Sequence, residues 1–480
     1  MREGGRRDGR RQPGAVVQTT GGNNPMKVIV IGAGEVGYHI ADILTREGID
    51  TVVIDRNEER LREISETLDV QTFVGSGSSP EVLKNAGMAQ ADMVVAVTDS
   101  DEANMIACLL ASTQSRIPIR IARIRNPELG GDFVLCSKDH LNIDLVINPE
   151  QEAVNEMIDL LEFPGAAEVF SFAGGRIRLL GFTIDEGAAV VGKRLADLRA
   201  MTPGVKVLVT SMVRDDRFIV PSGESVIEAG DYLFAVADAG RVRELLGFFG
   251  KDIRPPRRVI IIGGGNTGFM LAETIEKMGI TVKLIEKRRE KCDQLASRLE
   301  KTVVLHGDGT SQELLKEENI RDTDFFIAVT NDEEANILGA LLAKQLGAHK
   351  VISLIRRVDY IPLVGRVGID GVINPRHAAV GRILHFIRKG KIISATPLRD
   401  EKAEAFEFIA LETSEITDRP FKEIPFPQGT IVGAIVRGEE IIIPGGDSVI
   451  RPGDHCIIFS PRSAITQLEK LLTVKLEYFE

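Results

Sequence analysis

The chain has 480 residues, of which 43% are hydrophobic and 27% charged, a balance typical of a soluble globular protein with several domains. No apolar run approaches the eighteen or so residues that span a bilayer, which argues against this chain itself being a channel or carrier. A net charge of -11 argues against a general nucleic-acid binder, and four widely spaced cysteines indicate neither a disulfide framework nor a zinc site. We therefore expect a protein of the reducing cytoplasm.

Residues 1–25 differ in composition from the rest of the chain. Five arginines lie there among Gly, Gln, Asn and Pro, and no apolar stretch follows them. Without such a stretch the segment is not a secretory signal. We predict a disordered tail that ends just before Met26.

Residues 26–150 alternate short apolar runs with helical patterns. Runs that are apolar on both faces and separated by helices are typical of a parallel sheet covered on each side. The loop Gly32-Ala33-Gly34-Glu35-Val36-Gly37 follows the first run, and Asp55 ends the second, 21 residues after the middle glycine. This order is typical of a dinucleotide-binding unit. We predict strands at Val28–Ile31, Thr51–Ile54, Thr72–Val74, Met93–Val97, Ile119–Ile121 and Leu145–Ile147.

Residues 151–250 have a different character, with a connecting helix followed by short strands and few further helices. Pro and Gly mark turns in the run Ile219-Val220-Pro221-Ser222-Gly223, which leads to Gly230-Asp231. We predict a small α+β domain here. Residues 251–256, with Pro255-Pro256, are the expected linker to the second half.

Residues 257–380 repeat the first unit. The loop Gly263-Gly264-Gly265-Asn266-Thr267-Gly268 and Glu286 keep the 21-residue spacing, and Gly75-Ser76-Gly77 recurs 232 residues later as Gly307-Asp308-Gly309. The predicted strands are Val259–Ile262, Thr281–Ile285, Val303–Leu305, Phe325–Val329, Val351–Leu354 and Gly371–Ile373.

Residues 381–480 repeat the connecting helix and the small domain, with Ile442-Ile443-Pro444-Gly445-Gly446 answering the earlier run. The sequence thus predicts an α/β protein with two doubly wound, parallel-sheet Rossmann-like domains, each followed by a small α+β domain.

The glycine loops suit a nucleotide pyrophosphate. The first glycine permits a tight turn, the second lets the backbone approach phosphate, and the third lets the helix pack closely on the sheet. The helix that begins there offers free N–H groups and a partial positive charge. Asp55 and Glu286 are placed to accept both ribose hydroxyls and would repel a 2'-phosphate, which favours NAD(H) or an adenine nucleotide over NADP(H).

Several of these assignments have a plainer alternative. Either loop could fold tightly without binding a ligand, and Lys287-Arg288-Arg289 could be a solvated turn instead of a phosphate guide. Residues after the fourth strand of each unit could touch a nucleotide or simply cap a helix; they are Thr98, Asp99, Thr330 and Asn331. The acids that follow them are explained by the helix dipole, so no metal site is predicted.

A catalytic centre is not evident. The seven histidines occupy no repeated position, and none pairs with an acid in a recognisable dyad. The small domains are too short and turn-rich for a conventional catalytic domain. We expect a sensor and not an enzyme; the alternatives are an NAD-dependent oxidoreductase of unknown substrate and a free-standing nucleotide sensor that acts on another protein.

The chain from Met26 onward resembles the regulatory subunits of Trk-type potassium uptake systems, which carry tandem RCK (regulator of potassium conductance) units. The resemblance rests on residues 26–37, 92–98, 121–125, 327–337 and 429–438, and both kinds of domain follow the order of the family as RCK-N and RCK-C. The tail before Met26 departs from it.

The resemblance implies NAD(H), and ATP or ADP, as ligands. It implies nucleotide contacts at Gly32 to Val36, Asp55, Thr98, Asp99 and Arg123, and at Gly263 to Thr267, Glu286, Thr330 and Asn331. Arg123 suits a phosphate, although an ion pair would explain it equally well. The family also implies a peripheral protein on the inner face of the cell membrane. It would assemble as a homo-oligomeric ring, expected to be a tetramer, beneath an integral-membrane potassium-translocating subunit. We expect nucleotide binding to change the angle between N and C domains, and C domains to face one another.

Overall fold

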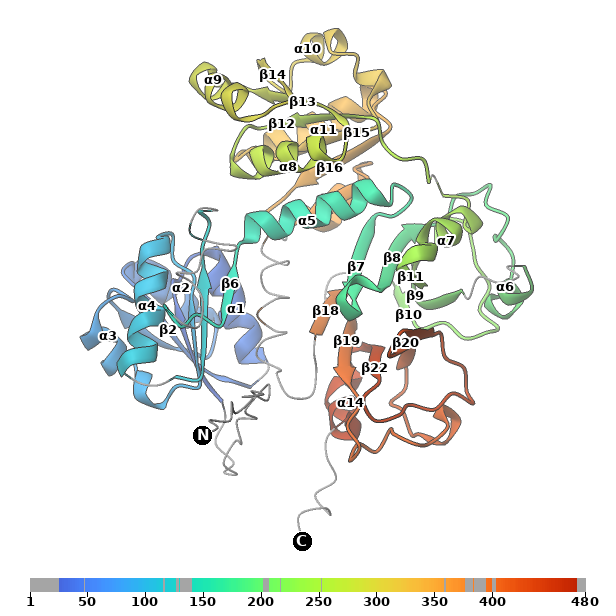
Figure 1. The fold of residues 1–480 in the computed structure, drawn as a ribbon, viewed down its shortest axis with the longest axis horizontal. Coiled ribbons are helices and arrows are strands. Elements are labelled where there is room, and N and C mark those ends of the chain that lie inside the picture. The colour runs from blue at the N-terminus through green and yellow to red at the C-terminus, as the bar shows by residue number, and fades with distance from the viewer. Residues whose placement is uncertain are drawn as a thin grey trace, which may run out of the picture.

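The computed structural model describes residues 26–46, 48–114, 117–126, 140–201, 207–215, 217–251, 253–357, 360–375, 394–398 and 403–472, with Leu129 and Ile383. The predicted tail at residues 1–25 and nearly all of the second connecting helix lie outside these residues. Four sheets organise the described chain, two parallel and two antiparallel. Figure 1 shows them as separate bodies, with the second parallel sheet at the top and the two antiparallel sheets stacked at the lower right.

The first parallel sheet has six strands in the order β3-β2-β1-β4-β5-β6, so the chain reverses direction across the sheet between β1 and β4. Its inner strands are apolar throughout because helices cover both faces. Every strand predicted from the sequence is present. The strands are β1 (Lys27–Ile31), β2 (Asp50–Asp55), β3 (Gln71–Val74), β4 (Met93–Ala96), β5 (Ile119–Arg123) and β6 (Leu145–Ile147), and the helices are α1 (Glu35–Arg46), α2 (Glu58–Thr67), α3 (Pro80–Asn85) and α4 (Asp101–Gln114).

The second parallel sheet repeats this topology with the order β14-β13-β12-β15-β16-β17. The strands pair in matching register, because Val28 opposes Met93 as Val259 opposes Phe325. The duplication inferred from the sequence is therefore visible strand by strand. The elements are β12 (Arg258–Ile262), α8 (Asn266–Lys277), β13 (Thr281–Glu286), α9 (Arg289–Arg298), β14 (Val303–His306), α10 (Gln312–Glu317), β15 (Phe325–Ala328), α11 (Glu333–Leu346), β16 (Lys350–Leu354), α12 (Ile361–Arg366) and β17 (Gly371–Ile373).

The two antiparallel sheets have five strands each, in the orders β10-β9-β11-β8-β7 and β18-β19-β22-β20-β21. The first C unit contains β7 (Glu168–Phe172), β8 (Ile177–Thr183), α6 (Leu195–Met201), β9 (Leu208–Arg214), β10 (Arg217–Ile219), β11 (Tyr232–Asp238) and α7 (Val242–Phe248). The second contains β18 (Ser394–Leu398), β19 (Ala403–Ile409), β20 (Ile431–Arg437), β21 (Glu440–Ile442), β22 (His455–Pro461) and α14 (Ile465–Leu472).

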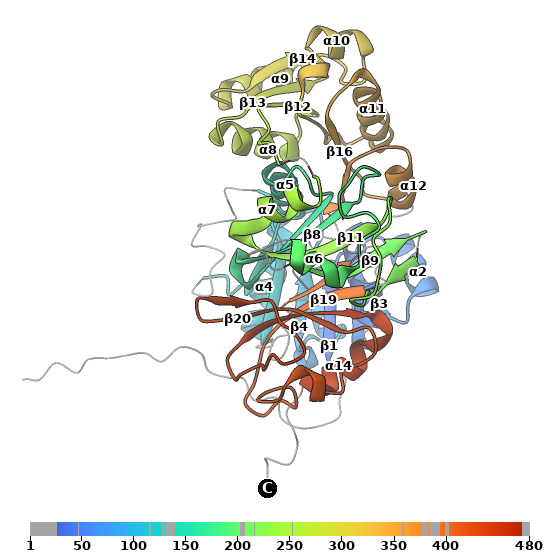
Figure 2. The same cartoon turned by 90° about the vertical axis from the view of Figure 1, so that its right-hand side faces the viewer.

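The two C units pack against each other within one chain. Phe172 and Phe234 of the first sheet share a buried cluster with Ala434 and Phe459 of the second. Close contact requires Gly433, because a Cβ there would lie 2.2 Å from the Phe459 ring. Inside the chain the two C units therefore face each other, and Figure 2 shows the second C sheet below the first, with both beneath the second N unit. Contact between C domains of different chains stays a prediction.

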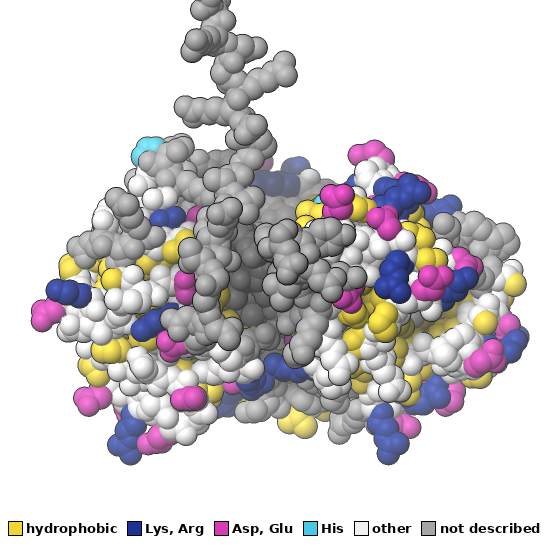
Figure 3. Space-filling model, turned by 90° about the horizontal axis from the view of Figure 1, so that it is seen from below, with side chains coloured by type: hydrophobic (Ala, Val, Ile, Leu, Met, Phe, Trp, Pro, Cys, Tyr) yellow, Lys and Arg dark blue, Asp and Glu magenta, His cyan; other side chains and the backbone are white. Residues whose placement is uncertain are grey.

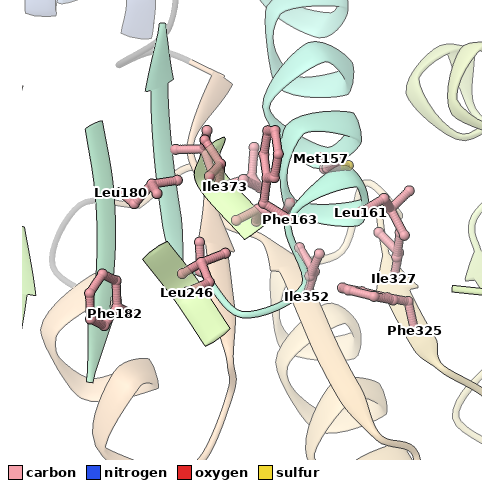
Figure 4. Packing of buried hydrophobic residues seen from close by; sticks show 14 of the residues in the cluster. Met157, Leu161, Phe163, Leu180, Phe182, Leu246, Phe325, Ile327, Ile352 and Ile373 are labelled. Carbon is pink, nitrogen blue, oxygen red and sulfur yellow. The ribbon is translucent and has the colours of Figure 1, made fainter. Parts of the chain in front are cut away.

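A long helix, α5 (Pro149–Glu162), leaves the first N unit and crosses to the second. Figure 1 shows it beneath the second parallel sheet, ahead of β7. Its apolar side contributes Met157 and Leu161 to a cluster that also contains Phe325 and Ile352, as Figure 4 shows. A segment after the second N unit makes the return contact, because Ile383 is buried in the core of the first N unit beside Val28 and Val30. Each half of the chain thus packs an apolar segment against the N unit of the other half.

Candidate functional site

The first and third glycines of each loop are required by the local backbone. Gly32 has a φ of +110° and Gly263 a φ of +102°, a region that side chains rarely adopt. A Cβ on Gly37 would lie 1.7 Å from the carbonyl oxygen of Gly32, and the equivalent distance from Gly268 to Gly263 is 1.9 Å. These glycines let α1 and α8 begin directly against the ends of β1 and β12.

The middle glycines face open space instead. The nearest atom to a Cβ on Gly34 would be Arg60 Nη1 at 3.9 Å, and a Cβ on Gly265 would meet nothing within 4 Å. The helices begin there with the exposed residues Glu35 and Asn266, ahead of the buried pairs Val36–Gly37 and Thr267–Gly268. Because the first amides of a helix have no acceptor within it, they point into this open space and can bind an anion.

The acids at the ends of β2 and β13 hold the loops in place. Asp55 Oδ2 accepts from the Ala33 amide at 2.6 Å, and Glu286 Oε2 accepts from the Gly264 amide at 2.9 Å. In each case the other carboxylate oxygen accepts from the amide two residues on, at Asn57 or Arg288. A carboxylate oxygen has two acceptor positions, so each acid retains capacity for a ribose hydroxyl.

The two copies compensate for acids of different length. A Cβ on Gly264 would lie 2.5 Å from Leu295 Cδ1 and 3.0 Å from Glu286 Oε2, so the longer Glu286 requires a bare backbone there. The shorter Asp55 leaves room for the methyl group of Ala33. Burial raises the pKa of Glu286, but hydrogen bonds from the Arg288 and Gly264 amides outweigh it and leave the pKa below its usual value. The acid is therefore ionised near neutral pH.

Thr98 and Thr330 lie at the carboxyl ends of β4 and β15, and each is bound by a buried asparagine that the sequence analysis missed. Asn104 Oδ1 accepts from the Thr98 amide at 2.9 Å and from its hydroxyl at 2.7 Å, while Nδ2 donates to the Arg123 carbonyl at 2.8 Å. Asn336 repeats this pattern with Thr330 and the carbonyl that ends β16. The sequence did contain a signal for these two residues, because Asn104 recurs as Asn336 at the 232-residue offset of the other repeated landmarks.

The residues that cap α4 and α11 are not the ones that the capping hypothesis named. Ser100 and Asp332 accept from the amides of Ala103 and Ala335, so Thr98, Asp99, Thr330 and Asn331 are not the N-caps. Asp99 is 82% exposed at its side chain and Asn331 is exposed too. Both are therefore accessible at this edge of the sheet, although Asp99 lies 3.9 Å from Arg123 and Asn331 accepts from Arg356 at 3.4 Å.

The neighbouring acids each join the start of a helix to the segment that follows the next strand. Asp101 accepts from the Arg125 and Asn126 amides at 3.0 and 2.8 Å. Glu333 accepts from the amides of Arg356 and Arg357 in the second unit. These contacts, together with the helix dipole, account for the acids. Within the described part of the chain, no three His, Cys, Asp or Glu side chains are placed to hold a metal ion.

The two sites differ in their cations. Arg123 ends β5, whereas Leu354, which is buried, ends β16. Lys287 and Arg288 are 79% and 69% exposed at their side chains and lie near Asp308 and Glu286. This exposure fits a solvated turn better than a fixed phosphate contact. The structure thus brings the predicted residues of each half to one sheet edge, with a guanidinium at the end of the fifth strand only in the first.

The fold and these loops define a protein of tandem Rossmann-like units, each paired with a small antiparallel domain. The TrkA-N domain matches residues 28–149 and 259–375, and the TrkA-C domain matches residues 179–250 and 405–473. The chain belongs to the family of Trk system potassium uptake proteins TrkA.

Relatives of this family cover nearly the whole chain. The Trk system potassium uptake protein TrkA of Halomonas elongata is 42% identical over 95% of this chain and all of its own length. The protein of the same name from Vibrio alginolyticus is 40% identical over 90% of this chain and 95% of its own.

Solved structures confirm the fold. The crystal structure of the GsuK RCK domain matches 94% of this chain and 96% of its own at 17% identity, with a TM-score of 0.59. The GsuK channel bound to NAD matches 94% of this chain and 80% of its own at 15% identity, with a TM-score of 0.60. In the part of the present chain that the structure describes, no helix is long and apolar enough to cross a membrane.

Proposed function

We propose that this protein is the nucleotide-sensing regulatory subunit of a Trk-type potassium uptake system. It binds NAD(H), with ATP or ADP as further ligands, on the cytoplasmic face of the cell membrane and gates a membrane subunit without chemistry of its own. The observation that carries the proposal is the duplicated loop, in which open space over Gly34 and Gly265 lies beside an acid fixed by the loop amides. The GsuK channel, which shares the fold, is described bound to NAD.

The assignment of nucleotide contacts follows from this geometry. Phosphates lie over the middle glycines and the first amides of α1 and α8, and the ribose lies against Asp55 or Glu286. Thr98, Asp99, Thr330 and Asn331 line the same edge. Arg123 adds a cation at the last residue of the fifth strand in the first half, whereas in the second half Arg356, two residues beyond that strand, contacts Asn331.

The proposed partner is an integral-membrane potassium-translocating subunit, and the proposed assembly is a ring of identical chains, four in number. Leu338 of α11 and Leu363 of α12 are 62% and 60% exposed, the adjoining Val367 is 55% exposed, and each offers apolar surface to a partner chain. Cationic and anionic side chains alternate on the face seen in Figure 3, which does not resemble a nucleic-acid surface.

Multiple sites make a gating role energetically sound. Moving a two-state gate from 1:99 to 99:1 needs about 5.5 kcal/mol of differential binding. One allosteric site typically couples by about 1–3 kcal/mol. A ring of duplicated sensors can supply the difference.

Calorimetry tests the proposal directly. NADH, NAD, ATP and ADP are titrated into the intact protein and into Asp55→Ala and Glu286→Ala, with circular dichroism as the control for folding. We expect each variant to lose one class of site. Wild-type protein that binds none of the four, or that turns over NADH with a metabolite, would refute the proposal. Potassium flux through the membrane subunit in vesicles, with and without NADH, then tests the gating step.

A further inference from the structure

One ion pair connects the first candidate site to the helix that leaves it. Arg123 Nη2 lies 3.2 Å from Glu150 Oε1, and Nη1 lies 3.9 Å from Asp99 Oδ1. The Arg123 side chain is only 13% exposed and that of Glu150 25%. The pair lies at the carboxyl edge of the sheet, where open α/β sheets bind ligands.

This pair is incompletely made. An arginine fork and a carboxylate can form two parallel hydrogen bonds, but only one is present between these side chains. Arg123 Nε and Glu150 Oε2 are both buried and have no hydrogen-bond partner in the described part of the chain. Buried polar atoms without partners are rare in folded proteins and call for a cause. A phosphate at this edge would offer Nε the acceptor that Glu150 does not.

Glu150 belongs to the first turn of α5, just after the N-cap Asn148 and Pro149. Asn148 also donates to the Arg125 carbonyl at 3.5 Å, so a second contact joins the segment just after β5 to the start of α5. Beyond this turn α5 buries Met157 and Leu161 against the second N unit. A change at Glu150 therefore acts on the element that joins the two N units.

We propose, on the basis of the function above, that Arg123 and Glu150 form a latch between the first nucleotide site and α5. A nucleotide phosphate over Gly34 competes with Glu150 for the Arg123 guanidinium, and the first turn of α5 loses its tie to β5. Among the described residues of the second half there is no counterpart of this latch, because the buried Leu354 occupies the place of Arg123. The two halves thus respond differently to the same ligand.

Glu150→Gln tests the latch, because it keeps the shape of the side chain and removes its charge. ADP and NADH are titrated by calorimetry in the Glu286→Ala background, where the first site acts alone. Amide hydrogen exchange across residues 150–156 is followed with and without each nucleotide. The matched control is Glu162→Gln at the exposed end of the same helix.

We expect Glu150→Gln to bind ADP and NADH about 5- to 10-fold more tightly, at the low end of couplings between sites. In the Glu286→Ala protein, nucleotide should speed amide exchange in the first turn of α5. With Glu150→Gln added, exchange there should be fast both with and without nucleotide. With Glu162→Gln added, exchange should match that of the Glu286→Ala protein. Equal or weaker binding by Glu150→Gln, or α5 exchange that ignores nucleotide, overturns the latch while leaving the sensor role intact. Absence of any binding to wild-type protein overturns both.

Discussion

At the scale of single residues, two glycines of the first loop are expected to have different roles. Gly37 is required by the fold, whereas Gly34 faces the space proposed for phosphate. Gly37→Ala would drive a Cβ to 1.7 Å from the Gly32 carbonyl, whereas Gly34→Ala meets only Arg60 Nη1 at 3.9 Å. We expect Gly37→Ala to lower the free energy of unfolding by about 1–3 kcal/mol, as overpacking does. Gly34→Ala should change it by less than about 0.5 kcal/mol but weaken NADH binding, since its methyl group enters the phosphate space. Thermal unfolding and calorimetry check both, and equal stability losses would contradict the distinction.

Glu156 on α5 gives a pH-dependent prediction. Burial raises the pKa of this carboxyl from 4.5 to about 8, and the charges of Glu152, Glu168 and Asp159 act in the same direction. A raised pKa means that ionisation disfavours the folded state, so stability should decline as pH rises from about 4.5 to about 8 and level off beyond. Glu156→Gln should remove this decline and be the more stable form at pH 8. Denaturant unfolding across this range measures it, with Glu162→Gln expected to retain the wild-type slope.

The residues that the sequence predicted are those whose role follows from local spacing. A strand, three glycines and an acid 21 residues on occupy fixed places, so the sequence correctly places Asp55 and Glu286 beside the loops that begin at Gly32 and Gly263, while their contact with a nucleotide stays a prediction. Asn104 was missed because its partners, the Thr98 backbone and the Arg123 carbonyl, come together only when β4 and β5 pair. Asp101 and Glu333 looked like helix-dipole acids for the same reason.

At the scale of elements, each C unit is stabilised by a pair between a partly exposed arginine and a buried aspartate. Arg437 donates to both oxygens of Asp454 at 2.8 and 2.9 Å, and Arg214 binds Asp231 in the same way. The pair joins β20 to the turn before β22. Asp454→Asn should cost about 3–5 kcal/mol of unfolding free energy, because it removes the buried negative charge that pairs with the Arg437 guanidinium.

The exposed pair Lys422–Asp447 is the matched control for this prediction. Its side chains are 61% and 88% exposed, although Lys422 Nζ and Asp447 Oδ1 lie 2.7 Å apart. Asp447→Asn should therefore cost less than about 1 kcal/mol. Denaturant unfolding of both variants compares them. Similar losses would mean that burial does not decide the strength of these pairs.

Elements were predictable to the extent that their patterns are local. All twelve strands of the parallel sheets follow from apolar runs between helical segments, and their observed ends differ from the predicted ones by at most two residues. The surface against which α5 packs could not be predicted from the sequence. Its apolar stripe fits any apolar surface, and only the assembled fold shows that Met157 and Leu161 serve the second N unit.

At the scale of the whole molecule, the two halves of the chain contact each other at three places. In two of them a segment of one half is buried against the N unit of the other, and in the third the C units pack together. Leu161 of α5 is buried with the second N unit, Ile383 is buried with the first, and Phe234 and Phe459 meet between the C units. Buried contacts therefore connect the two N units physically, in addition to the chain that joins them. This arrangement suits a sensor in which nucleotide alters the relation between units.

The shared core also predicts that the halves hold together without the chain that joins them. Residues 253–255 are exposed in the segment between α7 and β12, so a protease site inserted there can be cut in the folded protein. We expect the two fragments to coelute on size exclusion as one body, because cutting exposes none of the surface buried by Leu161, Phe234 and Phe459. Leu161→Ala should weaken the cut protein more than Asp447→Asn, since it opens a cavity that typically costs about 2–5 kcal/mol. Fragments that separate under native conditions would show that the peptide link, and not the buried surface, joins the two halves.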